Sequence, residues 1–175
     1  MSLFTPLLIA AAMIGTAGGL SPQRGETLPD IDISTSPNGI VLLPENVPSV
    51  FRDVFVRYTK VVAPNSKPIH ILAQDGWSEA RILKARNVLE HILTDVPGTR
   101  YGADKSIVAN TMADNHATLT LFNTEPDMRE AFRGPLRRVA LGMQDLRANE
   151  SPVEGHEDYM AHRTCLLYTS DAADE

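Results

Sequence analysis

The sequence predicts an α/β or α+β domain, built on a small sheet of three to five strands that is covered by helices. Two short runs, residues 69–73 and 117–122, are rich in β-branched residues or alternate apolar with polar residues, as strands do. Longer segments around them repeat apolar residues at helical spacing. With 43% hydrophobic residues, the chain can bury a core. The order helix, strand, helix, helix, strand, helix, strand predicts helical layers on a sheet.

The first predicted helix spans residues 50–62. Apolar and aromatic side chains recur there at helical spacing, Ser49 is a suitable N-cap, and Pro64 is a suitable stop. The strand 69–73 follows after a short connection. We therefore expect a helix to lead into the first central strand.

The next two predicted helices span residues 79–93 and 104–115. Ser78 is the expected N-cap of the first of them. Its apolar stripe includes Leu89 and Ile92, which we expect to be buried. The second helix is expected to turn the following residues inward: Ile107, Val108 and Met112.

The last predicted elements are the strand 117–122, a helix, and a further strand at about 139–146. Thr124 and Asp127 have the spacing of a capping box, so we expect them to open the helix. The helix should continue through Phe132, because a Gly-Pro pair follows shortly after it.

Residues 18–48 are predicted to be an irregular lead-in. Five prolines in this segment are spaced too closely for a helix. Residues 31–33 and 40–43 could still pair as a small hairpin around the turn dipeptide Asn38-Gly39.

A targeting segment is predicted at residues 1–17. Residues 3–14 form an apolar run that is too short to span a membrane, and the small residues 15–17 suit a signal peptidase. We therefore expect a signal peptide, a secreted or periplasmic product, and no stable membrane span after cleavage. No basic residue precedes the apolar run, so either the signal is weak or the true start lies upstream. A buried N-terminal helix is the alternative, although nothing caps this run and Pro6 interrupts it.

The charge balance excludes one class of partner. The chain has 16 Lys and Arg against 22 Asp and Glu, a net charge of −6, so it lacks the basic surface that binds nucleic acid. The densest basic group is Arg129, Arg133, Arg137 and Arg138, and the acids beside it are Glu125, Asp127 and Glu130. We interpret this group as a solvated helix face, with an anion site as the alternative.

The final segment, residues 165–175, resembles the translation of a sequencing-library adapter. We expect it to be a non-native tail that packs against nothing, which leaves residues 49–164 as a single incomplete domain, truncated at the C-terminus. Cys165, the only cysteine, lies in this tail. No disulfide or cysteine-based site is therefore expected in the domain.

The only concentration of metal-capable side chains lies near the end of the domain. It consists of Glu154, His156, Glu157, Asp158 and His162. Zinc peptidases place two histidines four residues apart, in H-E-x-x-H, so that both face one ion. His156 and His162 are about 240° apart around a helix, so they are candidate metal ligands only in a loop. An exposed polar connection without metal is the alternative.

Three other histidines and one turn are candidates for chemistry. We interpret His70, in a strand, and His91, in a helix, as structural residues, and His116 as a cation at a helix end. Residues 75–77 follow a strand, where α/β folds often place functional loops. We interpret them as a turn in which Trp77 is a packing lid. No nucleophile elbow or phosphate-binding glycine loop is present in the sequence.

Residues 50–164 resemble a group of secreted, largely uncharacterised proteins from environmental bacteria and fungi. The points of resemblance are 69–73 before a helix, 118–122 before an acidic helix start, and 144–146 before an acidic loop. This layout is similar to the upstream lobe of zinc-dependent peptidases. The resemblance implies the non-catalytic upstream part of a metallohydrolase-like domain, with a histidine-containing helix and zinc supplied downstream of Thr164 in the full-length protein. A secreted or periplasmic binding or structural module without catalysis is the alternative. Substrate and partner stay open.

Overall fold

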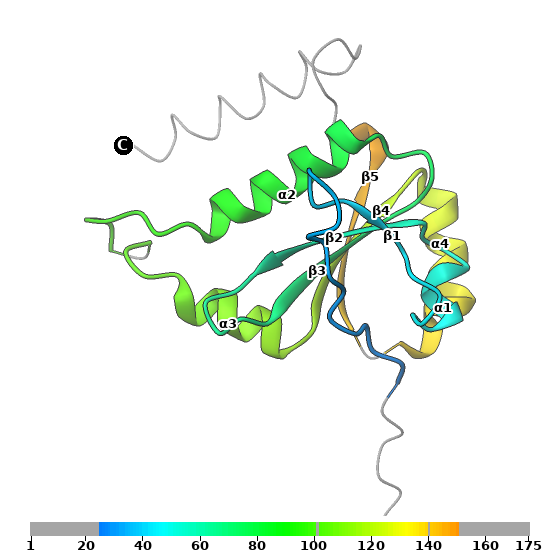
Figure 1. The fold of residues 1–175 in the computed structure, drawn as a ribbon, viewed down its shortest axis with the longest axis horizontal. Coiled ribbons are helices and arrows are strands. Elements are labelled where there is room, and N and C mark those ends of the chain that lie inside the picture. The colour runs from blue at the N-terminus through cyan, green and yellow to red at the C-terminus, as the bar shows by residue number, and fades with distance from the viewer. Residues whose placement is uncertain (1–24, 101, 140, 151–175) are drawn as a thin grey trace, which may run out of the picture.

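A computed structural model describes residues 25–100, 102–139 and 141–150 (Figure 1). The elements follow in the order β1 (Val41–Leu42), α1 (Ser49–Arg52), β2 (Arg57–Val62), β3 (Pro68–Ala73), α2 (Glu79–Leu93), α3 (Ser106–Asp114), β4 (Ala117–Phe122), α4 (Glu125–Arg133), η1 (Pro135–Arg138), β5 (Gly142–Arg147) and η2 (Ala148–Glu150), where η1 and η2 are 3-10 helices. One five-stranded mixed sheet with four α-helices makes the described part an α+β fold, so the predicted fold class is confirmed.

The sheet has the strand order β1-β2-β3-β4-β5. Its first three strands are antiparallel neighbours, whereas β3, β4 and β5 run parallel. Because Ala73 pairs with Leu121, and Phe122 with Arg147, the carboxyl ends of the three parallel strands meet at one edge. We call this the carboxyl edge, and it comprises the residues at and after these strand ends: 74–78, 123–124 and 147–150.

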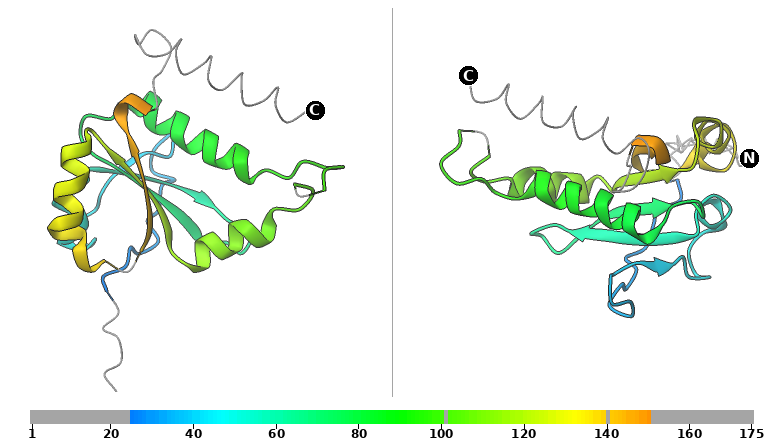
Figure 2. Two further views of the ribbon diagram at one scale, coloured as in Figure 1. Left: turned by 180° about the vertical axis from the view of Figure 1, so that it is seen from behind. Right: turned by 90° about the horizontal axis from the view of Figure 1, so that it is seen from above.

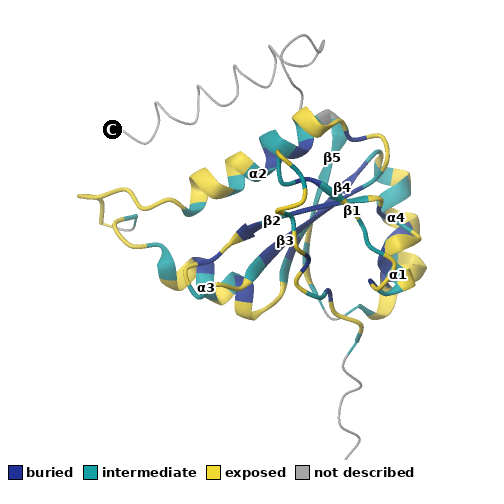
Figure 3. Ribbon diagram, in the orientation of Figure 1, coloured by how far each residue is buried: buried dark blue, intermediate teal, exposed yellow. Residues whose placement is uncertain are grey.

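Helices cover both faces of the sheet (Figures 1 and 2). On one face, Ile82 of α2 and Ala109 of α3 share a buried cluster with Ile71. On the other face, Phe51 of α1 shares a second cluster with Leu72, α4, η1 and the lead-in. Because Ile71 and Leu72 are neighbours in β3, they point to opposite sides of the sheet, which separates the two clusters. Burial accordingly concentrates in the strands between the layers (Figure 3).

The predicted helix over residues 50–62 is wrong. Its helical part, α1, ends at Arg52, and residues from Arg57 onward form the strand β2. Both faces of β2 are covered, so Tyr58, Thr59 and Val61 are all buried. The apolar residues of β2 do not alternate strictly with its polar residues, and they continue the helical spacing of the residues before them. Ser49 is the first helical residue, and the N-cap is the residue before it.

The two helices on the first face, α2 and α3, are present as predicted. Some of the side chains that we expected to face the core are exposed instead. Ile107 and Val108 of α3 are 74% and 54% exposed, whereas Ala109 and Ala113 are buried. Small alanines let α3 approach the sheet closely, and they carry too weak a hydrophobic signal to fix the phase of a nine-residue helix. Met112 packs against the core as expected.

The apolar stripe of α2 is also narrower than predicted. Ile82 and Ala85 are its buried residues, and Leu89 is half-buried against the core. Ile92 is 58% exposed, so the prediction that it is buried is wrong. Leu93, the next residue, packs against the core instead, so Ile92 lies outside the inner face of the helix.

Two predicted N-caps are confirmed. The Ser78 hydroxyl accepts a hydrogen bond from the backbone N–H of Arg81, and the Thr124 hydroxyl accepts one from Asp127. These bonds satisfy backbone donors that have no partner within the helix. The last strand, β5, begins at Gly142 and not at 139, because η1 occupies the residues before it.

The lead-in packs on the second face of the sheet. Leu28 and Ile31 are buried there. The predicted hairpin between residues 31–33 and 40–43 is wrong, because β1 pairs with β2 and not with residues 31–33. Gly39 has a φ of +68°, as the predicted turn requires.

Several predictions fall outside the described residues. They are the signal peptide at 1–17, the tail at 165–175, and the candidate ligands His156 and His162. Within the part of the chain that the structure describes, no helix is long and apolar enough to cross a membrane.

Candidate functional site

The carboxyl edge begins with two loops that are tied to each other. The backbone N–H of Asn123 donates to Gln74 Oε1 at 2.7 Å, and Asn123 Nδ2 donates to Asp75 Oδ1 at 3.0 Å. Gly76 completes this contact, because a Cβ at its position would lie 2.5 Å from Asn123 Oδ1. The loops after β3 and β4 are therefore held in one arrangement, and a side chain at position 76 would displace the amide of Asn123.

Trp77 connects the loop after β3 to the end of β4. Its side chain is buried, and its Nε1–H donates to the carbonyl of Phe122 at 3.0 Å. Arg57 Nη1 donates to the carbonyl of Trp77 at 2.5 Å. The interpretation of residues 75–77 as a turn closed by a packing tryptophan is consistent with these contacts, since the indole is not available to a ligand.

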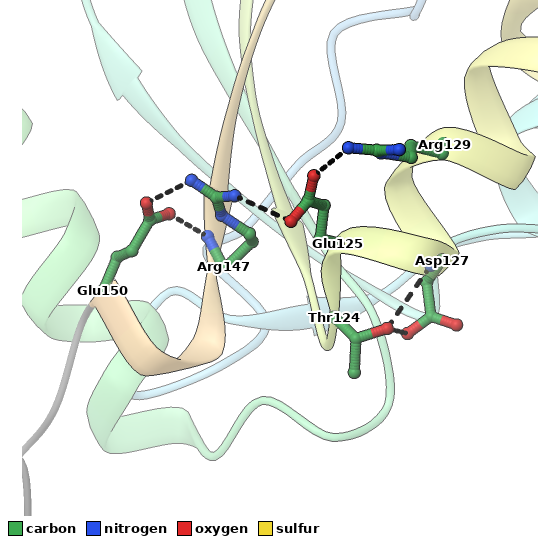
Figure 4. Close-up of polar contacts among 6 residues, drawn as sticks. All are labelled: Thr124, Glu125, Asp127, Arg129, Arg147 and Glu150. Carbon is green, nitrogen blue, oxygen red and sulfur yellow. Dashed lines mark hydrogen bonds and ion pairs between the residues drawn. The ribbon is translucent and has the colours of Figure 1, made fainter.

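A charged network lies beside the two loops (Figure 4). Glu125, in the first turn of α4, pairs with Arg129 and lies 3.7 Å from Arg147 Nη1 at the end of β5. Arg147 Nη2 donates to Glu150 Oε1 at 2.5 Å, and the Arg147 backbone N–H donates to Glu150 Oε2 at 2.7 Å. The side chain of Asp127 bonds to Thr124 Oγ1 at 2.6 Å. The network thus joins the start of α4 to the point where the chain leaves β5.

The electrostatics of this edge favour the ionised forms of Asp75 and Arg147. Hydrogen bonds from the Asn123 side chain and then from the Gly76 backbone lower the pKa of Asp75 below its usual value. The hydrogen bond to Glu150, with the charges of Glu150 and Glu125, raises the pKa of Arg147. A general acid or base should titrate near neutral pH, and both shifts move these groups away from it. The arrangement therefore supports positioning and not proton transfer.

The histidines of the described residues lie apart from this edge. His70 is buried in β3, and its Nδ1 lies 2.9 Å from the hydroxyl of Tyr58. Burial lowers the pKa of His70 to about 4 and raises that of Tyr58. His91 is exposed on α2, and His116 is exposed just after α3 with a φ of 53°. No described group of three or more His, Cys, Asp and Glu residues is placed to hold a metal ion.

Sequence reasoning missed two features of this arrangement. The Tyr58–His70 pair depends on β2 being a strand, and a reading of residues 57–62 with a period of two would have placed both rings on one face. The contact between Arg147 and Glu125 joins residues from two elements, so no local spacing reveals it. The loop at 75–77 was identified from its position after a strand.

No protein-family model, curated protein or solved structure matches the chain. Conclusions about function therefore depend on the geometry of the carboxyl edge and on the residues that follow it in the sequence.

Proposed function

We propose that the described residues are the non-catalytic upstream part of a metallohydrolase-like domain in an exported protein. The observation that supports this is the path of the chain at β5. β5 runs parallel to β3 and β4, so the chain passes through Arg147 and Glu150 to the carboxyl edge. Functional groups in open sheets with parallel strands gather at this edge. The acidic, histidine-containing segment 154–162 follows directly.

The role of the described residues in this proposal is to fix the position of that continuation. The Arg147–Glu150 contacts hold the last turn of the described chain, and Glu125 connects it to α4. The contacts between Asn123 and the loop after β3 immobilise the rest of the edge. Such supporting contacts are what a catalytic site needs from its scaffold.

The distance along the chain allows ligands from the continuation to reach this edge. His156 is six residues beyond Glu150, which spans at most about 20 Å when extended. A catalytic zinc site uses three protein ligands and a water, and the expected set includes histidines from a helix downstream of Thr164. When bound, zinc would supply an activated water. The described residues would hold the surrounding loops.

Zinc titration tests the proposal. Isothermal calorimetry of zinc into the 18–164 fragment should show no submicromolar site, because His156 and His162 alone are too few ligands. The same domain with its natural continuation, recovered from the gene, should bind one zinc tightly and lose it when a downstream histidine is changed to Ala. Tight binding by 18–164 that is lost in His156→Ala would place the site within this segment and contradict the downstream assignment.

The outcome also separates the proposal from its alternative, an exported binding or structural module. A natural continuation that has no H-E-x-x-H or H-x-x-x-H helix and binds no zinc would favour that module. Export is tested separately, by N-terminal sequencing of the mature product. A start near Gly18 supports export, whereas intact Met1 in a cytosolic form contradicts it.

A further inference from the structure

Part of the lead-in lies as a strap on the second face of the sheet. We use this name for residues 25–33, all of which the structure describes. The strap runs past β2 (Figure 1), and its residues Leu28 and Ile31 are buried in the second core cluster. None of its residues belongs to a strand or a helix, so no ladder of backbone hydrogen bonds ties it to the sheet. The strap is therefore held mainly by individual contacts.

Two polar contacts fasten the strap to β2. Asp30 forms an ion pair with Lys60, whose side chain is mostly buried. The backbone of Ile31 donates a hydrogen bond to the hydroxyl of Tyr58, and this hydroxyl lies 2.9 Å from Nδ1 of His70. A hydroxyl can accept one hydrogen bond while it donates its own hydrogen to another group. One chain of hydrogen bonds thus runs from the strap through Tyr58 to the buried imidazole.

This chain of hydrogen bonds requires a neutral His70. Nδ1 can accept the hydrogen of Tyr58 only while it carries no proton, because both ring nitrogens are donors in the imidazolium form. After protonation, Nδ1 and the backbone of Ile31 would both donate to the Tyr58 oxygen, and the hydroxyl hydrogen would lose its acceptor. A buried donor without a partner costs free energy. A proton on His70 therefore weakens the attachment of the strap.

The charged groups around His70 do not offset this cost. Asp30, on the strap, attracts a proton to His70, but its carboxylate is already paired with Lys60. Lys60 of β2 and His116, just before β4, both disfavour the protonated form. His70 is also 2% exposed, and a buried charge is less stable than one in water.

We propose that the strap is a pH-sensitive device, in which protonation of His70 releases residues 25–33 while the sheet stays folded. The strap opens before the strand beneath it, because β3 is paired with β2 on one side and with β4 on the other. Release admits water to the imidazole and uncovers the apolar surface under Leu28 and Ile31. Opening of the strap is independent of the zinc site proposed downstream.

The direction of the pH effect follows from the two states of the strap. Burial is the largest cause that lowers the pKa of His70 to about 4 in the closed form, and its ordinary value of 6.5 returns when water reaches it. As the pH falls from 6.5 toward 4, the open form takes up the proton first and becomes more populated. Between pH 7 and pH 5 the opening equilibrium constant should rise about 20-fold.

Native-state hydrogen exchange of the full 175-residue chain, followed by NMR at pH 7 and pH 5, tests the proposal. After correction for intrinsic exchange rates, the opening constant of the Ile31 amide should show this rise. At both pH values the Ile31 amide should open more readily than the amides of β3, which need global unfolding. In His70→Gln, whose side-chain oxygen can still accept from Tyr58, the pH dependence should disappear.

Two matched controls remove other histidines. His116→Gln, at the exposed histidine near His70, and His91→Gln, on α2, should both keep the full pH dependence. Circular dichroism verifies that the variants are folded. An Ile31 amide as protected as the amides of β3 at both pH values would show that the strap opens only when the domain unfolds, and would overturn the proposal.

Two other outcomes also contradict it. Opening of the Ile31 amide that does not change with pH, or that changes equally in His70→Gln, would remove the role of His70. In the original chain, which does not depend on any variant folding, a rise that begins only below about pH 4 would assign the effect to carboxyls such as Asp32.

Discussion

Acidification should destabilise the protein through His70. This side chain is 2% exposed, and its Nδ1 lies 2.9 Å from the hydroxyl of Tyr58, which is itself buried. Burial is the main cause that lowers the pKa of His70 to about 4. The charge of Asp30 opposes the shift, and His116 and Lys60 add smaller contributions in the same direction as burial. Protonation would therefore place an unfavourable charge between the sheet and the lead-in.

The sign and size of the effect follow from the two pKa values. In the unfolded chain, His70 has its ordinary pKa of 6.5, so the unfolded state takes up the proton first as the pH falls. Stability is then lost from about pH 6.5 downward until the folded pKa near 4 is passed. The full loss is about 3 kcal/mol, and about 2 kcal/mol of it should appear between pH 7 and pH 5.

Urea unfolding at pH 7 and pH 5 measures this loss. His70→Gln keeps a side-chain oxygen that can accept the Tyr58 hydroxyl but cannot titrate, so the pH dependence of its unfolding free energy should shrink by about 2 kcal/mol. His91→Gln, at an exposed position, should keep the wild-type dependence. The carboxyls of Asp32, Asp75 and Asp104 have lowered pKa values, so their stabilisation is lost only at more acid pH.

The result that would refute this reasoning is a His70→Gln variant with the full pH dependence of the original chain. Such a result would mean that the loss comes from other groups or that His70 accepts a proton without cost. A large reduction of the pH dependence in His91→Gln would also contradict the assignment of the stability loss to the buried His70.

Two further predictions concern packing. Ile82→Ala should lower the unfolding free energy by about 2–5 kcal/mol, because Ile82 is 1% exposed. Ile92→Ala, at an exposed position, should change the unfolding free energy by less than about 0.5 kcal/mol. Comparable losses for the two variants in denaturant titrations would show that the buried face of α2 is assigned incorrectly. Gly76→Ala should cost about 1–3 kcal/mol, because the added methyl meets Asn123 Oδ1 at 2.5 Å. Gly142→Ala, where the nearest atom is at 3.5 Å, is the control, and equal thermal shifts in the two variants would contradict the close contact.

Local signals in the sequence determined several elements of this protein. Ser78 and Thr124 marked the starts of α2 and α4, because a hydroxyl that caps a helix acts within three residues of itself. The strands β3 and β4 were evident from β-branching and alternation over six residues. The turn at 75–77 was placed correctly because its residues follow β3 directly. Each of these features is signalled by residues that are close together in the sequence, although the strands themselves pair with distant segments.

Tertiary structure alone decided the identity of β2 and the partners of the charged side chains. Residues 57–62 become a strand because β3 offers hydrogen bonds on one side and both faces are then buried, which no local pattern encodes. The pair of Glu125 and Arg129 follows from helical spacing within α4, but the contact of Glu125 with Arg147 depends on where β5 ends beside α4. Arg133, Arg137 and Arg138 have no ion-pair partner among the described residues. Charge pairing falls off over a few ångströms in space, so the fold and not the order of residues decides which charges are balanced.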